Sequence, residues 1–226
     1  MGAGATEPDI LPALGAPGLP EAYRDLRRGV GLTAVTDPAC LAALSDPDRT
    51  LLGDAQKQFL LDALERSDAT FKFVVTPAPI MEIVAQPYDR WEGYRAERDE
   101  ILRFVSDHDI RNVVFLSTDL HASMISTVRL TAVHGGILRE SAFLPVEAIA
   151  GPIAHETLGD DIAETRGPEV LPVFEGLLKQ IAKVECVELD AFSYGVVEVD
   201  PQAGNATITL KDENGTELCK KVTEAR

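Results

Sequence analysis

Three residues near the ends of apolar or helical segments carry side chains that bind metal ions or transfer protons: Asp89, Asp119 and His121. Asp119 and His121 follow the apolar run at residues 113–116 closely. Residues two positions apart in an extended segment face the same side, so we expect these two side chains to converge on one ion or proton. Asp89 can join them if strand ends meet at one sheet edge. Two carboxylates and an imidazole suit a cation such as calcium, manganese or iron.

Structural roles are alternatives for the same three residues. Asp89 stands where a long helical pattern begins, so it is also suited to cap that helix or to interact with its dipole. Asp119 is also suited to cap a helix, with His121 beside it by coincidence. The sequence alone leaves both interpretations open.

The other histidines occupy positions that are typical of structural roles. His108 lies at a polar helix end, where a cation complements the helix dipole, and His134 precedes a Gly-Gly turn. His155 opens a helical pattern after Gly151-Pro152, where capping is a less obvious role. We expect no direct catalytic role for these three. The sequence contains no Gly-x-Ser-x-Gly elbow, Walker loop or dinucleotide fingerprint, so acyl transfer and nucleotide cofactors have no support.

The composition excludes several classes of partner. The chain has 226 residues, of which 45% are hydrophobic and 26% charged, as in an ordinary folded domain. Its net charge of −16 argues against nucleic acid or an anionic membrane as a partner. A small phosphate ester remains compatible, because a metal ion can supply local positive charge. No apolar run approaches the roughly 18 residues of a membrane span, and the first residues lack the pattern of a secretory signal.

The three cysteines predict neither a zinc site nor a disulfide framework. Cys40, Cys186 and Cys219 lie far apart, and none forms a Cys-x-x-Cys pair. The cellular compartment therefore stays open.

The order of the expected elements indicates an α/β fold in one domain, residues 1–226, with an irregular lead-in at 1–20. A helix at residues 54–66 is expected to use Asp54 as its N-cap and to pack Phe59 and neighbouring apolar residues against a sheet. We predict strands at 30–35, 71–75, 112–116 and 142–150. We predict helices at 22–28, 54–66, 91–105, 155–164 and 169–183. The last part of the chain is predicted to be a β-meander, with strands at 191–199 and 206–211 and a further strand after a hairpin turn at 214–215.

Three motifs follow one another along the chain: LLGDAQ at residues 51–56, DRWEGY at 89–94 and NVVFLSTDLH at 112–121. In this order and spacing they resemble the PhoD-like (alkaline phosphatase D) metallophosphatases. The strand at Tyr194-Gly195-Val196-Val197 and the final hairpin also look like the C-terminal end of that family. The resemblance covers residues 23–218, which is nearly the whole chain.

This resemblance implies a calcineurin-like sandwich of two sheets flanked by helices. It also implies hydrolysis of phosphate mono- and diesters at a two-metal centre of iron and calcium. By the same resemblance, Asp89 matches a ligand of the calcium-type site, and Asp119 and His121 match the Asp-x-His ligands. The expected mechanism is metal-assisted hydrolysis of a small phosphate ester. Relatives are commonly exported.

The chain departs from the family pattern in one respect. Family members carry further ligands upstream: a Gly-Asp strand-end motif, a Tyr, and an Asp-Asp-His-like segment with a preceding Asn. We find none of these here, and the asparagines Asn112, Asn205 and Asn214 lie in other contexts. We therefore expect a C-terminal portion of the fold that lacks its N-terminal part and holds about half of the metal site. Apolar strand edges would then be exposed, which predicts a homo-oligomer or pairing with the missing half.

Three functional hypotheses remain. The first is a metal-dependent phosphatase or phosphodiesterase whose remaining ligands come from elsewhere. The second is a non-catalytic, degenerate relative that retains the fold and binds a metal or a partner. The third is a hydrolase that uses Asp119 and His121 as a dyad without metal.

Overall fold

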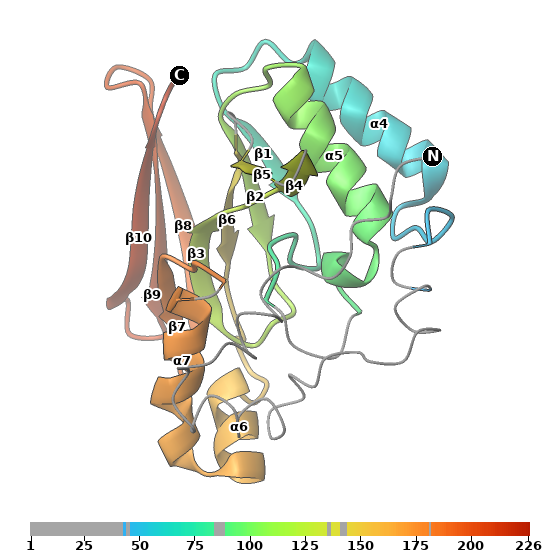
Figure 1. Cartoon of the computed structure of the whole chain (residues 1–226). Helices are drawn as coiled ribbons and strands as arrows, with labels where there is room; N and C mark the ends of the chain where they lie inside the picture. The colour runs from blue at the N-terminus through green and yellow to red at the C-terminus, as the bar shows by residue number, and fades with distance from the viewer. Residues whose placement is uncertain (1–42, 44–45, 84–88, 135–136, 141–143, 181) are drawn as a thin grey trace.

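The computed structural model describes residues 43, 46–83, 89–134, 137–140, 144–180 and 182–226. The described elements form layers (Figure 1): a small antiparallel sheet, a larger central sheet, and helices α4 and α5 on the far side of that central sheet. The predicted lead-in at 1–20, helix at 22–28 and strand at 30–35 lie outside the described residues.

The central sheet has five strands in the order β1-β2-β6-β3-β7. β1 pairs with β2, and β2 with β6, in parallel, whereas β3 runs antiparallel to both β6 and β7. The sheet consists of β1 (Lys72–Val75), β2 (Val113–Ser117), β3 (Ser123–Thr127), β6 (Val146–Ile149) and β7 (Cys186–Glu188). The predicted α/β class is therefore confirmed.

Strand β2 is buried on both faces, which explains its unbroken apolar run. Val113 and Phe115 belong to the core on one side of the sheet, together with residues of α5. Val114 belongs to a second core, which the small sheet closes with Ile208 and Leu210. Successive side chains of a strand point to opposite faces, so an apolar residue is required at every position of this strand.

The small sheet is a three-stranded antiparallel meander, as the sequence predicted. It consists of β8 (Ser193–Asp200), β9 (Asn205–Asp212) and β10 (Glu217–Glu224), in the order β10-β9-β8. The carboxylate of Asp212 accepts hydrogen bonds from the backbone N–H groups of Asn214 and Thr216, at 2.9 and 2.7 Å. These bonds confirm that this segment is a turn.

Further elements connect and cover the two main sheets. Strands β4 (Thr131–His134) and β5 (Ile137–Glu140) form a two-stranded antiparallel ribbon. Two short 3₁₀ helices, η1 (Trp91–Gly93) and η2 (Pro168–Val170), precede α5 (Arg95–Asp107) and α7 (Leu171–Gln180), and α6 (Leu158–Arg166) lies before η2.

Helix α4 (Gly53–Arg66) forms where it was predicted, but its N-cap was predicted wrongly and its buried face only partly correctly, since Leu60 and Leu64 contact the core and Phe59 does not. Its N-cap is Leu52, and Asp54 lies inside the first turn without capping. A carboxylate oxygen of Glu97 on α5 accepts hydrogen bonds from the N–H groups of Leu51 and Leu52, at 2.6 and 3.0 Å. A side chain of the neighbouring helix therefore binds the N-terminus of α4. Phe59 is 76% exposed, because α4 packs on α5 through Leu61 and Leu64 instead.

Cys186 on β7 and Cys219 on β10 form a disulfide bond, which the sequence analysis did not predict. The two residues are 33 positions apart and belong to different sheets. Sequence spacing carried no sign of the pairing, because only the packing of β10 against β7 brings the two sulfur atoms together. The bond joins the small sheet to the edge of the central sheet.

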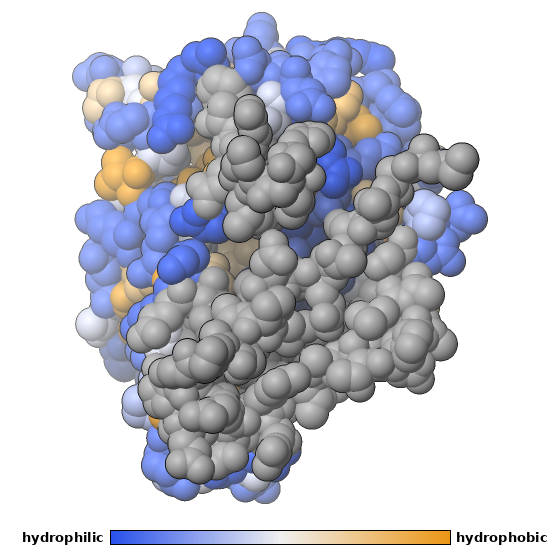
Figure 2. All heavy atoms as spheres, viewed as in Figure 1, coloured by the Kyte–Doolittle hydropathy of each residue, from blue (hydrophilic) through white to orange (hydrophobic). Residues whose placement is uncertain are grey.

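The surface shown in Figure 2 is mainly hydrophilic, with hydrophobic residues in small separate groups among the atoms that are coloured. Within the described part of the chain, no helix has the length and apolar character that crossing a membrane requires. The assignment of residues 1–226 to one domain stays a prediction.

Replacing both Cys186 and Cys219 by alanine is expected to lower the free energy of unfolding by about 3–4 kcal/mol, because the bond closes a long loop in the unfolded chain. Urea denaturation without reductant measures the change. Reduced wild-type protein should match the double variant. An unfolding midpoint identical to that of oxidised wild type would contradict the expectation.

Candidate active site

The carboxyl ends of the parallel strands β1, β2 and β6 lie at one edge of the central sheet. Loops after such strands frame a ligand-binding crevice in α/β proteins. The loop after β2 contains Asp119 and His121, and the loop after β6, residues 150–157, contains His155. This edge is therefore where the candidate residues can meet.

Asp119 and His121 both adopt left-handed backbone conformations, with φ of 67° and 59°. The expectation that they share one side of an extended segment is therefore wrong: β2 ends at Ser117, and a tight turn follows. Leu120 between them is buried, whereas Asp119 is exposed and His121 half-buried. Left-handed non-glycine residues cost conformational energy and are enriched at functional sites. Burial of Leu120 holds the turn in this conformation.

The loop after β6 lies directly against the turn after β2. The N–H of Ala150 donates to the Ser117 carbonyl at 3.0 Å, and the N–H of Leu158 donates to the His121 carbonyl at 2.7 Å. Gly151 has a φ of 122°, and a Cβ there would lie 3.4 Å from the Thr118 hydroxyl oxygen. The backbone conformation favours glycine at this position, and a Cβ would be in van der Waals contact with Thr118.

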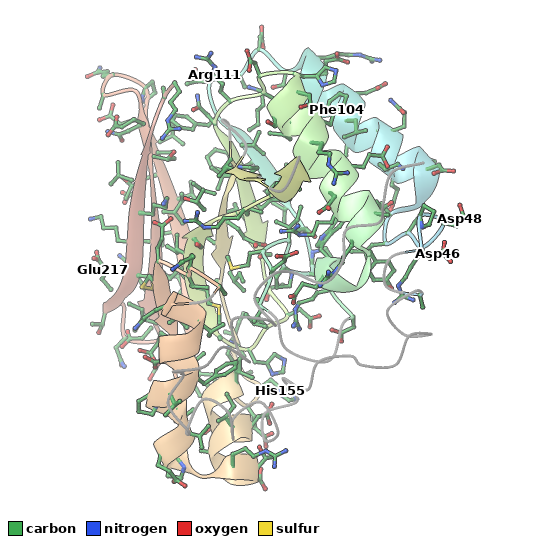
Figure 3. All side chains as sticks on the ribbon, in the orientation of Figure 1. Asp46, Asp48, Phe104, Arg111, His155 and Glu217 are labelled. Carbon is green, nitrogen blue, oxygen red and sulfur yellow. A yellow bond between two sulfur atoms is a disulfide. The ribbon has the colours of Figure 1, made fainter. Side chains whose placement is uncertain are left out.

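His155 contacts His121 across the two loops, with ring centroids 4.6 Å apart and ring planes inclined at 50°. The expectation that His155 opens a helix is wrong. Helix α6 begins at Leu158 and is capped by Thr157 in a capping box with Asp160. His155 is exposed and lies before α6, close to it in Figure 3. No direct role was expected for His155, because nothing near it in the sequence signals a neighbour 34 positions earlier in the chain.

Ser193 anchors the loop after β6 from the other side. Its hydroxyl oxygen accepts the N–H of Gly151 at 2.9 Å and the hydroxyl of Ser123 at 2.6 Å, and its N–H donates to the Pro152 carbonyl at 2.9 Å. Ser193 is the first residue of β8 and is buried. The small sheet thus helps to fix the loop that carries His155.

Glu147 on β6 supports the same edge from inside. Its fully buried carboxylate accepts the N–H groups of Ile80 and Met81, at 2.8 and 2.6 Å, and the hydroxyl of Ser117, at 2.6 Å. Ser117 ends β2, and Ile80 and Met81 follow β1. One side chain on β6 therefore links the end of β2 to the loop that follows β1.

Arg98 of α5 completes this buried network. Its Nε donates to the Ile80 carbonyl at 2.6 Å, and its Nη2 donates to the Arg129 carbonyl at 3.1 Å. Burial raises the pKa of Glu147, while the three hydrogen bonds and the positive charge of Arg98 oppose the rise. The loop after β1 is thus held by a carboxylate and a guanidinium on opposite sides.

Asp89 is exposed and precedes η1. Neither η1 nor α5 has a side-chain cap, so the capping role considered for Asp89 is not what the structure shows. The adjacent Arg90 forms a buried ion pair with Glu92 at 2.9 Å. The hydrogen bonds, ion pairs and ring contacts of the described residues do not link Asp89 to Asp119 or His121, so the three-residue ligand set stays a prediction.

The donors at this edge fit a metal ion in type. The Asp119 carboxylate and the His121 imidazole form no hydrogen bond to the rest of the described chain, and both are accessible to solvent. Carboxylate oxygen and imidazole nitrogen suit iron, manganese and, for the carboxylate, calcium. Across the described ranges, no three His, Cys, Asp or Glu residues lie close enough together to hold a metal ion. A complete centre therefore requires donors from outside these residues.

The chain is similar to known phosphatases in sequence and in structure. A family model described as "PhoD-like phosphatase" matches residues 23–208. Alkaline phosphatase D of Bacillus subtilis (strain 168) is 32% identical over 97 residues, which cover 38% of this chain and 16% of that protein. A solved structure titled "Structure of PhoD" matches with a TM-score of 0.59 and 21% identity, over 81% of this chain and 34% of that one. The chain thus spans about a third or less of each relative's length.

Replacing Glu147 by alanine is expected to lower the free energy of unfolding by about 2–5 kcal/mol, because three buried donors lose their acceptor and a cavity forms. Urea denaturation at pH 7 measures the loss. Glu198 is an exposed glutamate on β8, and its replacement by alanine should change stability by no more than about 0.5 kcal/mol. Equal effects of the two substitutions would contradict the supporting role of Glu147.

The stability that Glu147 contributes is expected to depend on pH. A carboxyl group whose pKa is raised by folding contributes fully below its unfolded pKa of about 4.3 and loses that contribution as the pH rises through the folded pKa. The difference in unfolding free energy between wild type and Glu147→Ala should therefore decrease as the pH rises above about 4.3. Denaturation curves of both proteins at several pH values test this, and a difference that grows with pH would contradict it.

Proposed function

The chain belongs to the PhoD-like phosphatase family, and from this premise we propose that it hydrolyses phosphate mono- or diesters at the β2–β6 edge of the central sheet. The observation that supports the proposal most directly is the strained turn after β2. It exposes Asp119 and His121 at the carboxyl edge, beside the loop after β6. Phosphatase-type activity is the function that fits both the family and this geometry.

We further propose that the fold is the calcineurin-like sandwich and that Asp89, Asp119 and His121 hold metal ions. Calcium and iron are the expected ions, with manganese as another suitable one. When bound, such ions polarise the phosphoryl oxygens and activate a water nucleophile. The remaining ligands would come from residues outside the described ranges, from a longer chain or from a second subunit.

The chain's own residues have two tasks in this proposal. Burial of Leu120 anchors the backbone turn that carries Asp119 and His121. The Glu147 network joins β6 to the end of β2 and to the loop after β1. A backbone turn that is already formed before the substrate arrives reduces the conformational entropy lost when the ester is positioned.

Replacing Asp119 by asparagine is expected to reduce hydrolysis of a chromogenic phosphodiester, bis-p-nitrophenyl phosphate, at least about 100-fold. The substitution removes the negative charge and keeps a side chain that tolerates the left-handed conformation. The kcat/KM of the purified chain, loaded with calcium and iron, measures the change, and elemental analysis shows whether bound metal falls with it.

Asp109→Asn is a matched control. Asp109 is also an exposed aspartate with a positive φ, of 53°, but it follows α5, away from the strand ends. This variant should retain wild-type turnover and metal content. A wild-type chain with neither bound metal nor turnover would support the non-catalytic alternative, and activity that survives exhaustive chelation would support the metal-free dyad.

A further inference from the structure

We propose that His155 is a phosphate-binding residue of this site, in which an imidazole N–H donates a hydrogen bond to a phosphoryl oxygen of the ester. The inference rests on the proposed function, because it assigns to the same site a further contact with the substrate. Three observations support it: the position of the loop that carries His155, the free nitrogens of its ring, and the charges at this edge.

The position of His155 is fixed by hydrogen bonds on both sides of its loop. Ala150 is bonded to Ser117 at the end of β2, Leu158 is bonded to His121, and Gly151 is bonded to Ser193. These contacts flank His155 in the sequence and hold its ring against that of His121, at 4.6 Å between centroids. The side chain is therefore held within reach of a group bound at Asp119 and His121.

The ring nitrogens of His155 are free for a ligand. The contact with His121 is between rings, and within the described residues neither nitrogen forms a hydrogen bond to the protein. His108 offers the opposite case, because its Nδ1 lies 3.0 Å from the Phe104 carbonyl oxygen and its ring stacks on Phe104. His155 is exposed, so its nitrogens face solvent at the site.

The charges of the loops after β2 and β6 leave few alternatives for binding an anion. Residues 118–122 and 150–157 contain no lysine or arginine, whereas they contain the acidic Asp119 and Glu156. A phosphate group requires hydrogen-bond donors around its oxygens. His121 is assigned to the metal, and the Thr157 hydroxyl donates to Asp190, so His155 and the exposed hydroxyl of Thr118 are the side-chain donors that these two loops leave for a ligand.

The variant His155→Phe tests this role, because phenylalanine keeps an aromatic ring for the contact with His121 and removes both nitrogens. Calorimetric titration of inorganic phosphate into the full, calcium-loaded chain should show a dissociation constant about 10-fold higher than in wild type. His108→Phe is the matched control and should bind phosphate like wild type. Figure 3 shows Phe104, the ring partner of His108, far from His155.

Several results would overturn the inference. The first is that His155→Phe binds phosphate with the same affinity as wild type. The second is that wild type binds no phosphate. The third is that His155→Phe loses its bound calcium, which would make His155 a metal ligand instead. A loss of affinity in His155→Ala that phenylalanine fully restores would also overturn it, because ring packing alone would then be the role of His155.

The same titration separates this inference from the proposed function. A chain that binds phosphate through His155 but hydrolyses no phosphate ester would support the inference and contradict the proposed function. A chain that hydrolyses esters with unchanged KM in His155→Phe, and binds phosphate equally well, would support the proposed function and contradict the inference.

Discussion

The fully buried carboxylate of Glu147 lies on the middle strand of the central sheet, and the arrangement of the candidate site depends on its three hydrogen bonds. A charge in such a place is tolerated only when donors surround it, since transfer from water is otherwise very costly. The donors here are two backbone N–H groups after β1 and the hydroxyl at the end of β2. Because this one carboxylate needs hydrogen-bond donors, β6, the end of β2 and the loop after β1 are held together.

The small sheet adds a second constraint on the same edge. Ser193 of β8 binds the loop after β6, and the disulfide between Cys186 and Cys219 joins this sheet to β7. The loop that carries His155 is thus fixed between the turn after β2 and the small sheet. Such support from both sides allows the strained backbone at Asp119 and His121 to persist, because relaxing it would disturb packed neighbours.

Much of the fold was predictable because it follows from local patterns. The apolar run of β2, the meander of β8 to β10 and the turn at Asp212 all depend on periodicity or on turn-forming residues. Predictions about helix faces and caps were weaker. Phe59 is exposed and Asp54 does not cap α4, because contact with α5 decides which face of α4 is buried and which group binds its first N–H groups.

The sequence by itself determined the residue types at the candidate site, the order of the strands that lead to it and the family resemblance, since these are properties of local chemistry and spacing. Only the tertiary structure decided that Asp119 and His121 lie in a left-handed turn, that His155 joins His121, and that Glu147 supports the edge. These relations join residues that are distant along the chain. They depend on strand pairing and burial, and residue spacing does not encode them.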